Sequence, residues 1–172
     1  NGQKYIYVRI ACPVDVTVKY DGETLCSVED NLSTRTAFGS LTFEDNAEES
    51  ETNGDNRVKV LRLKEGIDYD IKIEGNGRGY MNYTIGFMDD TGEYSDLRRF
   101  NNIKITKRTV IDTVATPSKA TILKVDEDGD GKYDLTYKAT ENSRGELVDY
   151  TYIIYIAIGA AAVVIILIVT II

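Results

Sequence analysis

The chain has 172 residues, enough for one domain with a sizeable core, and its 28 acidic and 20 basic side chains give a formal net charge of -8. This acidic balance argues against nucleic acid as a partner, because phosphate binding needs a concentrated basic surface. The chain has no histidine, which excludes Ser-His-Asp and Cys-His catalysis and histidine metal ligands.

The first 114 residues contain about nine short segments in which apolar and polar residues alternate, the pattern of strands with one buried face. Turn residues separate them, and no stretch before residue 152 keeps a helical period. The pattern predicts a mainly β chain whose residues 1–114 form an antiparallel, Ig-like β-sandwich head. The predicted strands are 4–10, 14–20, 24–28, 37–43, 57–63, 69–74, 80–88, 97–105 and 107–114.

The two cysteines flank the first predicted hairpin, which turns at an Asp-Gly pair typical of a two-residue type I′ turn. In that register Tyr20 faces Glu23, so Cys26 faces Thr17 and not Cys12. The sequence therefore favours two buried thiols over a bridge between Cys12 and Cys26, which would need another arrangement. Two cysteines do not settle the redox compartment.

A break at "ATPSKA", residues 115–120, separates the predicted head from a second unit at residues 115–140. That unit contains two further predicted strands, 121–125 and 135–139, with an acidic loop between them. Residues 141–151 are polar and lead to the apolar C-terminus, so we expect them to form a stalk.

The acidic loop "DEDGDGKYD" matches the pattern D-x-D-x-D-G-x-x-D. Ca²⁺ binds six to eight oxygens, and alternate residues of a tight turn can aim their carboxylates inward. A helical EF-hand would carry Glu at the twelfth position, where Tyr137 stands, and the flanking segments read as strands. We therefore predict a strand-loop-strand calcium site, whose ligands are Asp126, Asp128, Asp130, the carbonyl of Lys132, and Asp134.

This loop resembles the calcium turn of integrin-type FG-GAP propeller repeats, and its sequence pattern is similar to that of dockerin and thrombospondin loops. A propeller needs several copies, and the chain has one. The resemblance therefore implies a cation site rather than a whole fold. The alternative is a solvated hairpin without a metal, since acidic Asp-Gly turns are common there. If the loop binds calcium, a site of this kind suits the millimolar calcium found outside cells.

Residues 152–172 carry no charged side chain and predict a C-terminal hydrophobic α-helix. As a helix they would span roughly 31 Å, close to the ~30 Å hydrocarbon core of a bilayer. Tyrosines at the start of the segment are typical of a membrane interface. Its small residues would let another helix approach closely: Ala157, Gly159, Ala160, Ala161 and Ala162. The sequence leaves open whether this helix lies in a bilayer, in the core of a filament, or inside the domain itself.

Two segments, "RIACPVDVTVKYDGETL" at residues 9–25 and "YDIKIEGNGRGYMNYTI" at residues 69–85, resemble β-sandwich domains of secreted and surface proteins of Gram-positive anaerobes. In those domains a CPVDV-type hairpin begins the fold. The resemblance implies an extracellular accessory or structural module, and it carries over no catalytic residue. The chain begins at Asn1, which we interpret as a processed form or a fragment.

The sequence is compatible with three functions. The first is a non-enzymatic structural protein of the cell surface: a calcium-stabilised β-domain displayed by its apolar helix, anchored in membrane lipid or assembled with copies of itself into a pilus-like filament. The second is a membrane-anchored adhesin or carbohydrate-binding module, with a glycan or protein ligand. The third is a small carboxylate-dependent glycosidase, which the sequence disfavours because no acid pair stands at a recognisable spacing.

Overall fold

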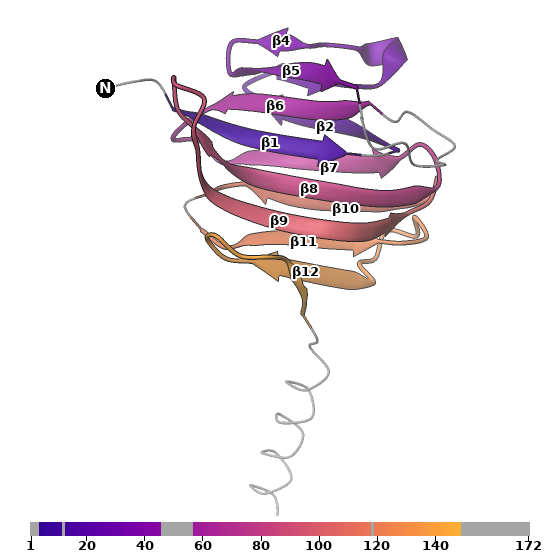
Figure 1. The fold of residues 1–172 in the computed structure, drawn as a ribbon. Helices are drawn as coiled ribbons and strands as arrows, with labels where there is room; N and C mark the ends of the chain where they lie inside the picture. Colours follow the sequence, from indigo (N-terminus) through magenta and orange to yellow (C-terminus); the bar gives the residue numbers. More distant parts are fainter. Residues whose placement is uncertain (1–3, 12, 46–56, 118, 149–172) are drawn as a thin grey trace, which may run out of the picture.

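The computed structural model describes residues 4–11, 13–45, 57–117 and 119–148. Within these ranges the chain is mainly β, with thirteen strands and one short 3₁₀ helix, Glu29–Asn31. The strands form two antiparallel sheets that lie one behind the other (Figure 1). The prediction of a mainly β chain with a sandwich of antiparallel sheets is confirmed.

Sheet 1 has six strands and sheet 2 has seven. In spatial order, sheet 1 contains β4 (Arg35–Thr36), β5 (Gly39–Glu44), β6 (Val58–Lys64), β1 (Tyr5–Ala11), β8 (Gly79–Met88) and β9 (Tyr94–Ile105). Sheet 2 contains β13 (Glu146–Leu147), β12 (Leu135–Ala139), β11 (Thr121–Asp126), β10 (Val110–Ala115), β7 (Tyr69–Gly75), β2 (Val14–Tyr20) and β3 (Glu23–Cys26).

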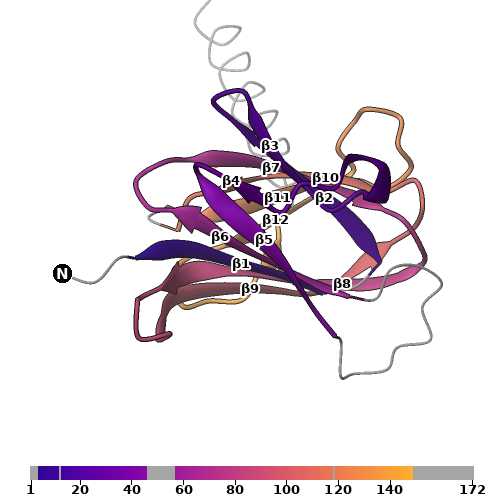
Figure 2. The ribbon, with the colours of Figure 1, turned by 90° about the horizontal axis from the view of Figure 1, so that it is seen from above.

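The core lies between the two sheets, which Figure 2 shows as separate layers. Alternation places every second residue of a strand on the inner face, as with Ile6, Val8 and Ile10 of β1, which are at most 2% exposed. Tyr83 of β8 and Phe100 of β9 are fully buried, with their rings edge to face and their centroids 6.0 Å apart. Each such side chain contributes about 1.5–3 kcal/mol of hydrophobic free energy, so this alternation is what holds the sheets together.

The first hairpin has the predicted register. Its turn residues, Asp21 and Gly22, both have positive φ, +49° and +78°, as a type I′ turn requires. Cys26 pairs with Thr17, and its buried thiol lies 3.6 Å from the Thr17 hydroxyl. Cys12 lies outside the described residues.

Several predicted strands have different limits in the structure; β9, for example, begins at Tyr94 and not at residue 97. The segment predicted as 24–28 ends as a strand at Cys26, and the 3₁₀ helix follows shortly after it. The strand predicted from residue 107 begins at Val110, because residues 106–109 form a turn. In that turn the backbone N–H of Thr106 donates to Thr109 Oγ1 at 2.9 Å, and the backbone N–H of Thr109 donates to Thr106 O at 3.1 Å.

The predicted unit at residues 115–140 continues sheet 2, since β11 pairs with β10 and β12 pairs with β11. The segment predicted as a stalk also contacts the sandwich where it is described. The backbone N–H of Gly145 donates to Arg99 O of β9 at 2.7 Å, and β13 pairs with β12. Residues 141–148 are therefore tied to both sheets.

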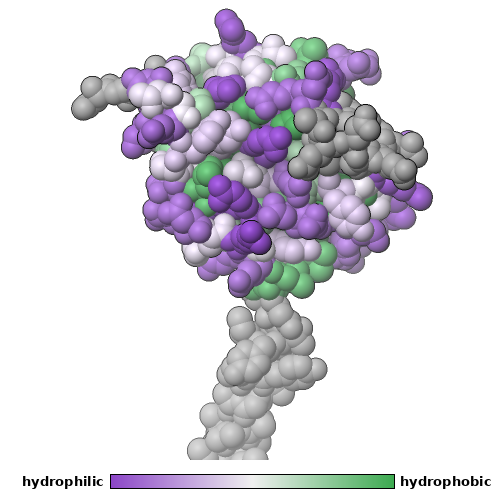
Figure 3. Space-filling model, in the orientation of Figure 1, coloured by the Kyte–Doolittle hydropathy of each residue, from purple (hydrophilic) through white to green (hydrophobic). Residues whose placement is uncertain are grey.

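Figure 3 shows the face of the molecule that carries sheet 1. Hydrophilic residues cover most of it, and hydrophobic residues gather at its lower end, at the level of β12 in Figure 1. Leu147 of β13, which pairs with β12, is 55% exposed. The described chain ends beside this strand pair, where the backbone N–H of Val148 donates to Thr136 O at 2.7 Å.

In the part of the chain that the structure describes, no helix combines the length and the apolar character needed to cross a bilayer. The helix predicted at residues 152–172, with its small packing residues, lies outside the described ranges.

Candidate metal centre

The acidic loop joins β11 to β12 at one end of sheet 2. Asp126 is the last residue of β11, and β12 begins at Leu135. The backbone N–H of Asp134, the residue before β12, donates to Val125 O at 2.8 Å, which extends the hydrogen bonding of the two strands by one residue towards the loop. The strands therefore close the base of the loop and hold its ends together.

Asp126 organises the loop from its centre. Its carboxylate Oδ1 accepts hydrogen bonds from the backbone N–H groups of Gly129, at 2.7 Å, and Asp130, at 3.2 Å. The other oxygen, Oδ2, accepts one from the backbone N–H of Gly131 at 2.8 Å. Asp126 is 4% exposed, so these amides surround a carboxylate that has almost no contact with solvent.

These hydrogen bonds also govern the charge of Asp126. Burial of the carboxyl group raises its pKa, but the amides of Gly131 and Gly129 donate to the ionised form and lower it, with the net result that the pKa lies below its ordinary value. The central carboxylate is therefore ionised at neutral pH.

The other aspartates bend the loop with hydrogen bonds of their own. Asp128 Oδ1 accepts from the backbone N–H of Asp130 at 3.1 Å, and Asp130 Oδ1 accepts from that of Lys132 at 2.8 Å. Both are local turns in which an Asp side chain bonds the backbone two residues further on. Asp134 Oδ2 accepts from the backbone N–H of Glu127 at 2.8 Å, across the base of the loop.

Three of the predicted ligands come together in space. One carboxylate oxygen from each of Asp126, Asp128 and Asp130 lies within 4.8 Å of the other two. Across the described ranges, no other three acidic or cysteine side chains approach one another this closely. Asp134 stands outside this group of three, at the base of the loop.

The donor set fits a hard cation. Carboxylate oxygens are the ligands that Ca²⁺ prefers, and the two further predicted ligands, the carbonyl of Lys132 and the carboxylate of Asp134, are not part of the group of three. The group contains no sulfur or imidazole donor, so it does not fit the tetrahedral sites that zinc prefers.

Two glycines make the tight path of the loop possible. Gly129 and Gly131 have φ of +75° and +89°, a region that side chains with a Cβ rarely adopt. A Cβ on Gly129 would also stand 2.8 Å from the backbone oxygen of Arg108, so only glycine fits there without a shift of the loop or of its neighbour.

Arg108, in the turn before β10, is a contact of the loop that the sequence did not indicate. Its Nε donates to Asp128 O at 2.7 Å, and its guanidinium Nη2 lies 3.9 Å from Asp128 Oδ2. Both side chains are more than half exposed, so solvent weakens this ion pair. The contact comes from the pairing of β10 with β11, which brings the two turns together.

No protein-family model matches the chain, and it matches neither a curated protein nor a solved structure. The likeness to surface domains of Gram-positive anaerobes stays a prediction that rests on the two segments quoted for it.

Proposed function

We propose that this protein is a non-enzymatic structural protein of the cell surface. In this proposal an Ig-like β-sandwich is stabilised by Ca²⁺ and displayed outside the cell by the apolar helix at residues 152–172, through which copies of the chain assemble into a pilus-like filament. The observation that carries it is the convergence of three carboxylates in a loop closed by the β11–β12 ladder.

Calcium would act on the fold rather than on a substrate. A bound ion removes the repulsion among Asp126, Asp128 and Asp130 and holds the ends of β11 and β12 together. An ion that binds only the folded chain stabilises it by mass action, and the millimolar calcium outside cells is enough for a site of modest affinity.

The position of the loop supports a role in display. Val148, the last described residue, bonds to Thr136, which lies only two residues after Asp134 of the loop. The chain therefore runs towards its apolar segment from a point close to the predicted calcium site. A mechanical force applied to that segment would act first on the hydrogen bonds between β12 and β13. These lie next to the ends of β11 and β12, which a bound ion would hold together.

Thermal unfolding tests the calcium part of the proposal. In millimolar Ca²⁺, taken as ten times the dissociation constant, binding adds about 1.4 kcal/mol, which raises the melting temperature by roughly 3–6 °C over that in EGTA. Asp130→Ala should abolish this difference, because it removes one of the three converging carboxylates.

Asp89→Ala is the matched control. Asp89 Oδ1 also accepts backbone hydrogen bonds in an exposed turn, from Thr91 and Glu93, each at 2.9 Å, but it is not in the group of three. The control should melt at a lower temperature in both conditions and keep the calcium difference. Equal melting of the unmutated protein in calcium and in EGTA would refute the calcium part.

A further inference from the structure

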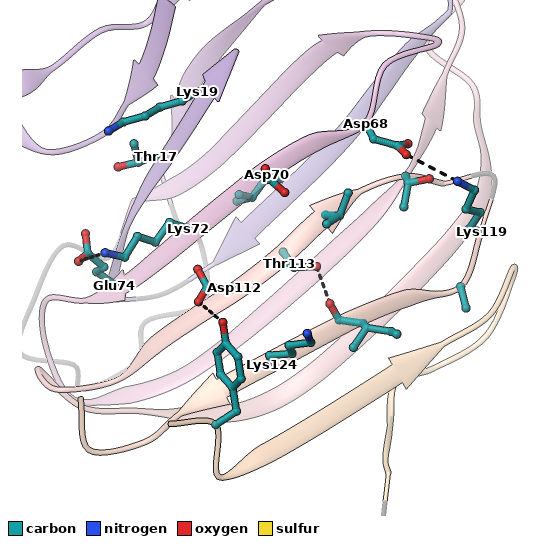
Figure 4. Close-up of a pocket in the computed structure, with 16 residues that line it drawn as sticks. Thr17, Lys19, Asp68, Asp70, Lys72, Glu74, Asp112, Thr113, Lys119 and Lys124 are labelled. Atoms are coloured by element: carbon teal, nitrogen blue, oxygen red, sulfur yellow. Dashed lines mark hydrogen bonds and ion pairs between the residues drawn. The ribbon is translucent and has the colours of Figure 1, made fainter. Parts of the chain in front are cut away.

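A groove of about 980 Å³ lies on the outer face of sheet 2, and one of its lining residues, Tyr133, belongs to the acidic loop (Figure 4). It crosses β2, β7, β10 and β11. On β7, for example, Ile71 and Ile73 are buried, while Asp70 and Lys72 point outward into the groove. Its volume is within the range of about 300–1,000 Å³ that small-ligand sites occupy.

The strand registers place the side chains of the groove floor in a row across the sheet. Thr17 pairs with Lys72, Lys72 with Asp112, and Asp112 with Lys124. Neighbouring charges in this row alternate in sign, so each stabilises the next. Tyr133 follows at the end of the row, where its hydroxyl donates to Asp112 Oδ2 at 2.7 Å.

The groove is electrically balanced although the chain as a whole has a net charge of -8. Four lysines and four carboxylates line it, and they account for half of its sixteen lining residues. Two ion pairs are formed among them, Lys72 with Glu74 at 3.2 Å and Lys119 with Asp68 at 3.7 Å (Figure 4). The floor of the groove therefore offers closely spaced hydrogen-bond donors and acceptors and has no net charge.

Apolar surface is present between these polar groups. Val114 of β10 and Ile122 of β11 are 37% and 38% exposed, and the Tyr133 ring is 50% exposed. The hydrogen bond to Asp112 fixes the orientation of this ring, and Lys124 Nζ lies 5.5 Å from its centroid. A ligand with flat apolar faces and polar edges matches such a surface.

The charges and residue types that line the groove favour some classes of ligand over others. A polyanion such as nucleic acid needs a net positive surface, which the groove lacks. Protein interfaces are depleted in Lys, Asp and Glu, the residues that make up half of this lining. We propose that the groove binds a neutral oligosaccharide, whose hydroxyl groups both donate and accept hydrogen bonds and whose ring faces carry apolar C–H groups.

The test measures binding of neutral oligosaccharides of glucose, mannose, xylose and N-acetylglucosamine to the full-length chain by NMR titration. The detergent is an amine oxide, because maltoside or glucoside detergents would compete, and calcium is present throughout. At least one of the four sugars should bind, and an increase in salt should change its affinity by less than about twofold, because the groove has no net charge.

Tyr133→Ala should weaken this binding roughly tenfold or more, since it removes an exposed aromatic contact at the end of the row. Tyr133→Phe keeps the ring but loses the bond to Asp112, and should weaken binding less. Tyr80→Ala is the control, because Tyr80 is 59% exposed and lies outside the groove.

Three results would overturn the inference: no binding by any of the four neutral sugars, equal binding by wild type and Tyr133→Ala, or binding confined to charged glycans with a steep loss in salt. The melting temperatures of the variants are measured beside these titrations. A folded variant with reduced affinity separates a binding role from a structural one.

Discussion

Asp126→Ala should lower the melting temperature by roughly 5–10 °C, both in calcium and in EGTA, the largest loss expected among single changes in the acidic loop. The reason lies in the folded chain itself. The carboxylate is almost fully buried and accepts hydrogen bonds from the amides of Gly129, Asp130 and Gly131. Alanine leaves these amides without an acceptor. Gly129 and Gly131, which have positive φ, then lose the hydrogen bonds that stabilise their conformation.

Asp126→Asn removes the negative charge and keeps one accepting oxygen, which can still accept from Gly129 and Asp130, but its NH₂ group cannot accept from the N–H of Gly131. We expect a smaller loss of stability in EGTA than for alanine, and a loss of the calcium effect in both variants. If Asp126→Ala melted within about 1 °C of the unmutated chain in EGTA, the central role of this carboxylate would be wrong.

Acid titration checks the same residue. Because the folded pKa of Asp126 is lowered, the unfolded chain takes up the proton more readily than the folded one. The stability contributed by the carboxylate is complete above its ordinary pKa of 3.8 and is lost as the pH falls below that value through the folded pKa. In EGTA, the stability gap between wild type and Asp126→Asn should shrink below this pH.

Deletion of residues 152–172 should have the other large effect, the complete loss of assembly. This segment has no charged residue, so exposing it to water is unfavourable, and we propose that it is buried in lipid or against copies of itself. Full-length protein prepared without detergent should show filaments in negative-stain electron microscopy. The truncated chain should be a dispersed monomer.

The truncated chain also provides the control, because residues 4–148 include both sheets and the whole acidic loop. Its melting temperature should match that of the full-length protein. Full-length chains that float with lipid vesicles and form no filaments would favour membrane anchoring over self-assembly. A full-length chain that stays a dispersed monomer in plain buffer would contradict both forms of display.

The strand pattern could be predicted because it follows from local alternation. Each of the nine predicted segments of the head overlaps a strand, and the Asp21-Gly22 turn has the expected register. The two strands missed, β4 and β13, are two residues long, too short to show any alternation. The turn at residues 106–109 was not predicted, because one of its hydrogen bonds, from the Thr106 N–H, goes to the side chain of Thr109, and alternation does not show such a bond.

The arrangement of the sheets could not be read in this way, because periodicity does not say which strands pair. Nothing local places β1 between β6 and β8, or joins β11 to β10. The acidic loop could be predicted from its residue pattern. The contact of Arg108 with Asp128 could not, because it depends on the pairing of β10 with β11. The groove likewise depends on Lys72, Asp112 and Lys124, which only the registers bring side by side.

Calorimetric titration of Ca²⁺ into the full-length chain is the most direct test of the calcium site. We predict one ion per chain, with a dissociation constant of about 10⁻⁴–10⁻³ M, as extracellular modules have. Asp130→Ala should give no saturable heat, whereas Asp89→Ala should titrate like wild type. The absence of saturable binding to the unmutated chain up to about 10 mM Ca²⁺, or equal binding by Asp130→Ala, would contradict the account.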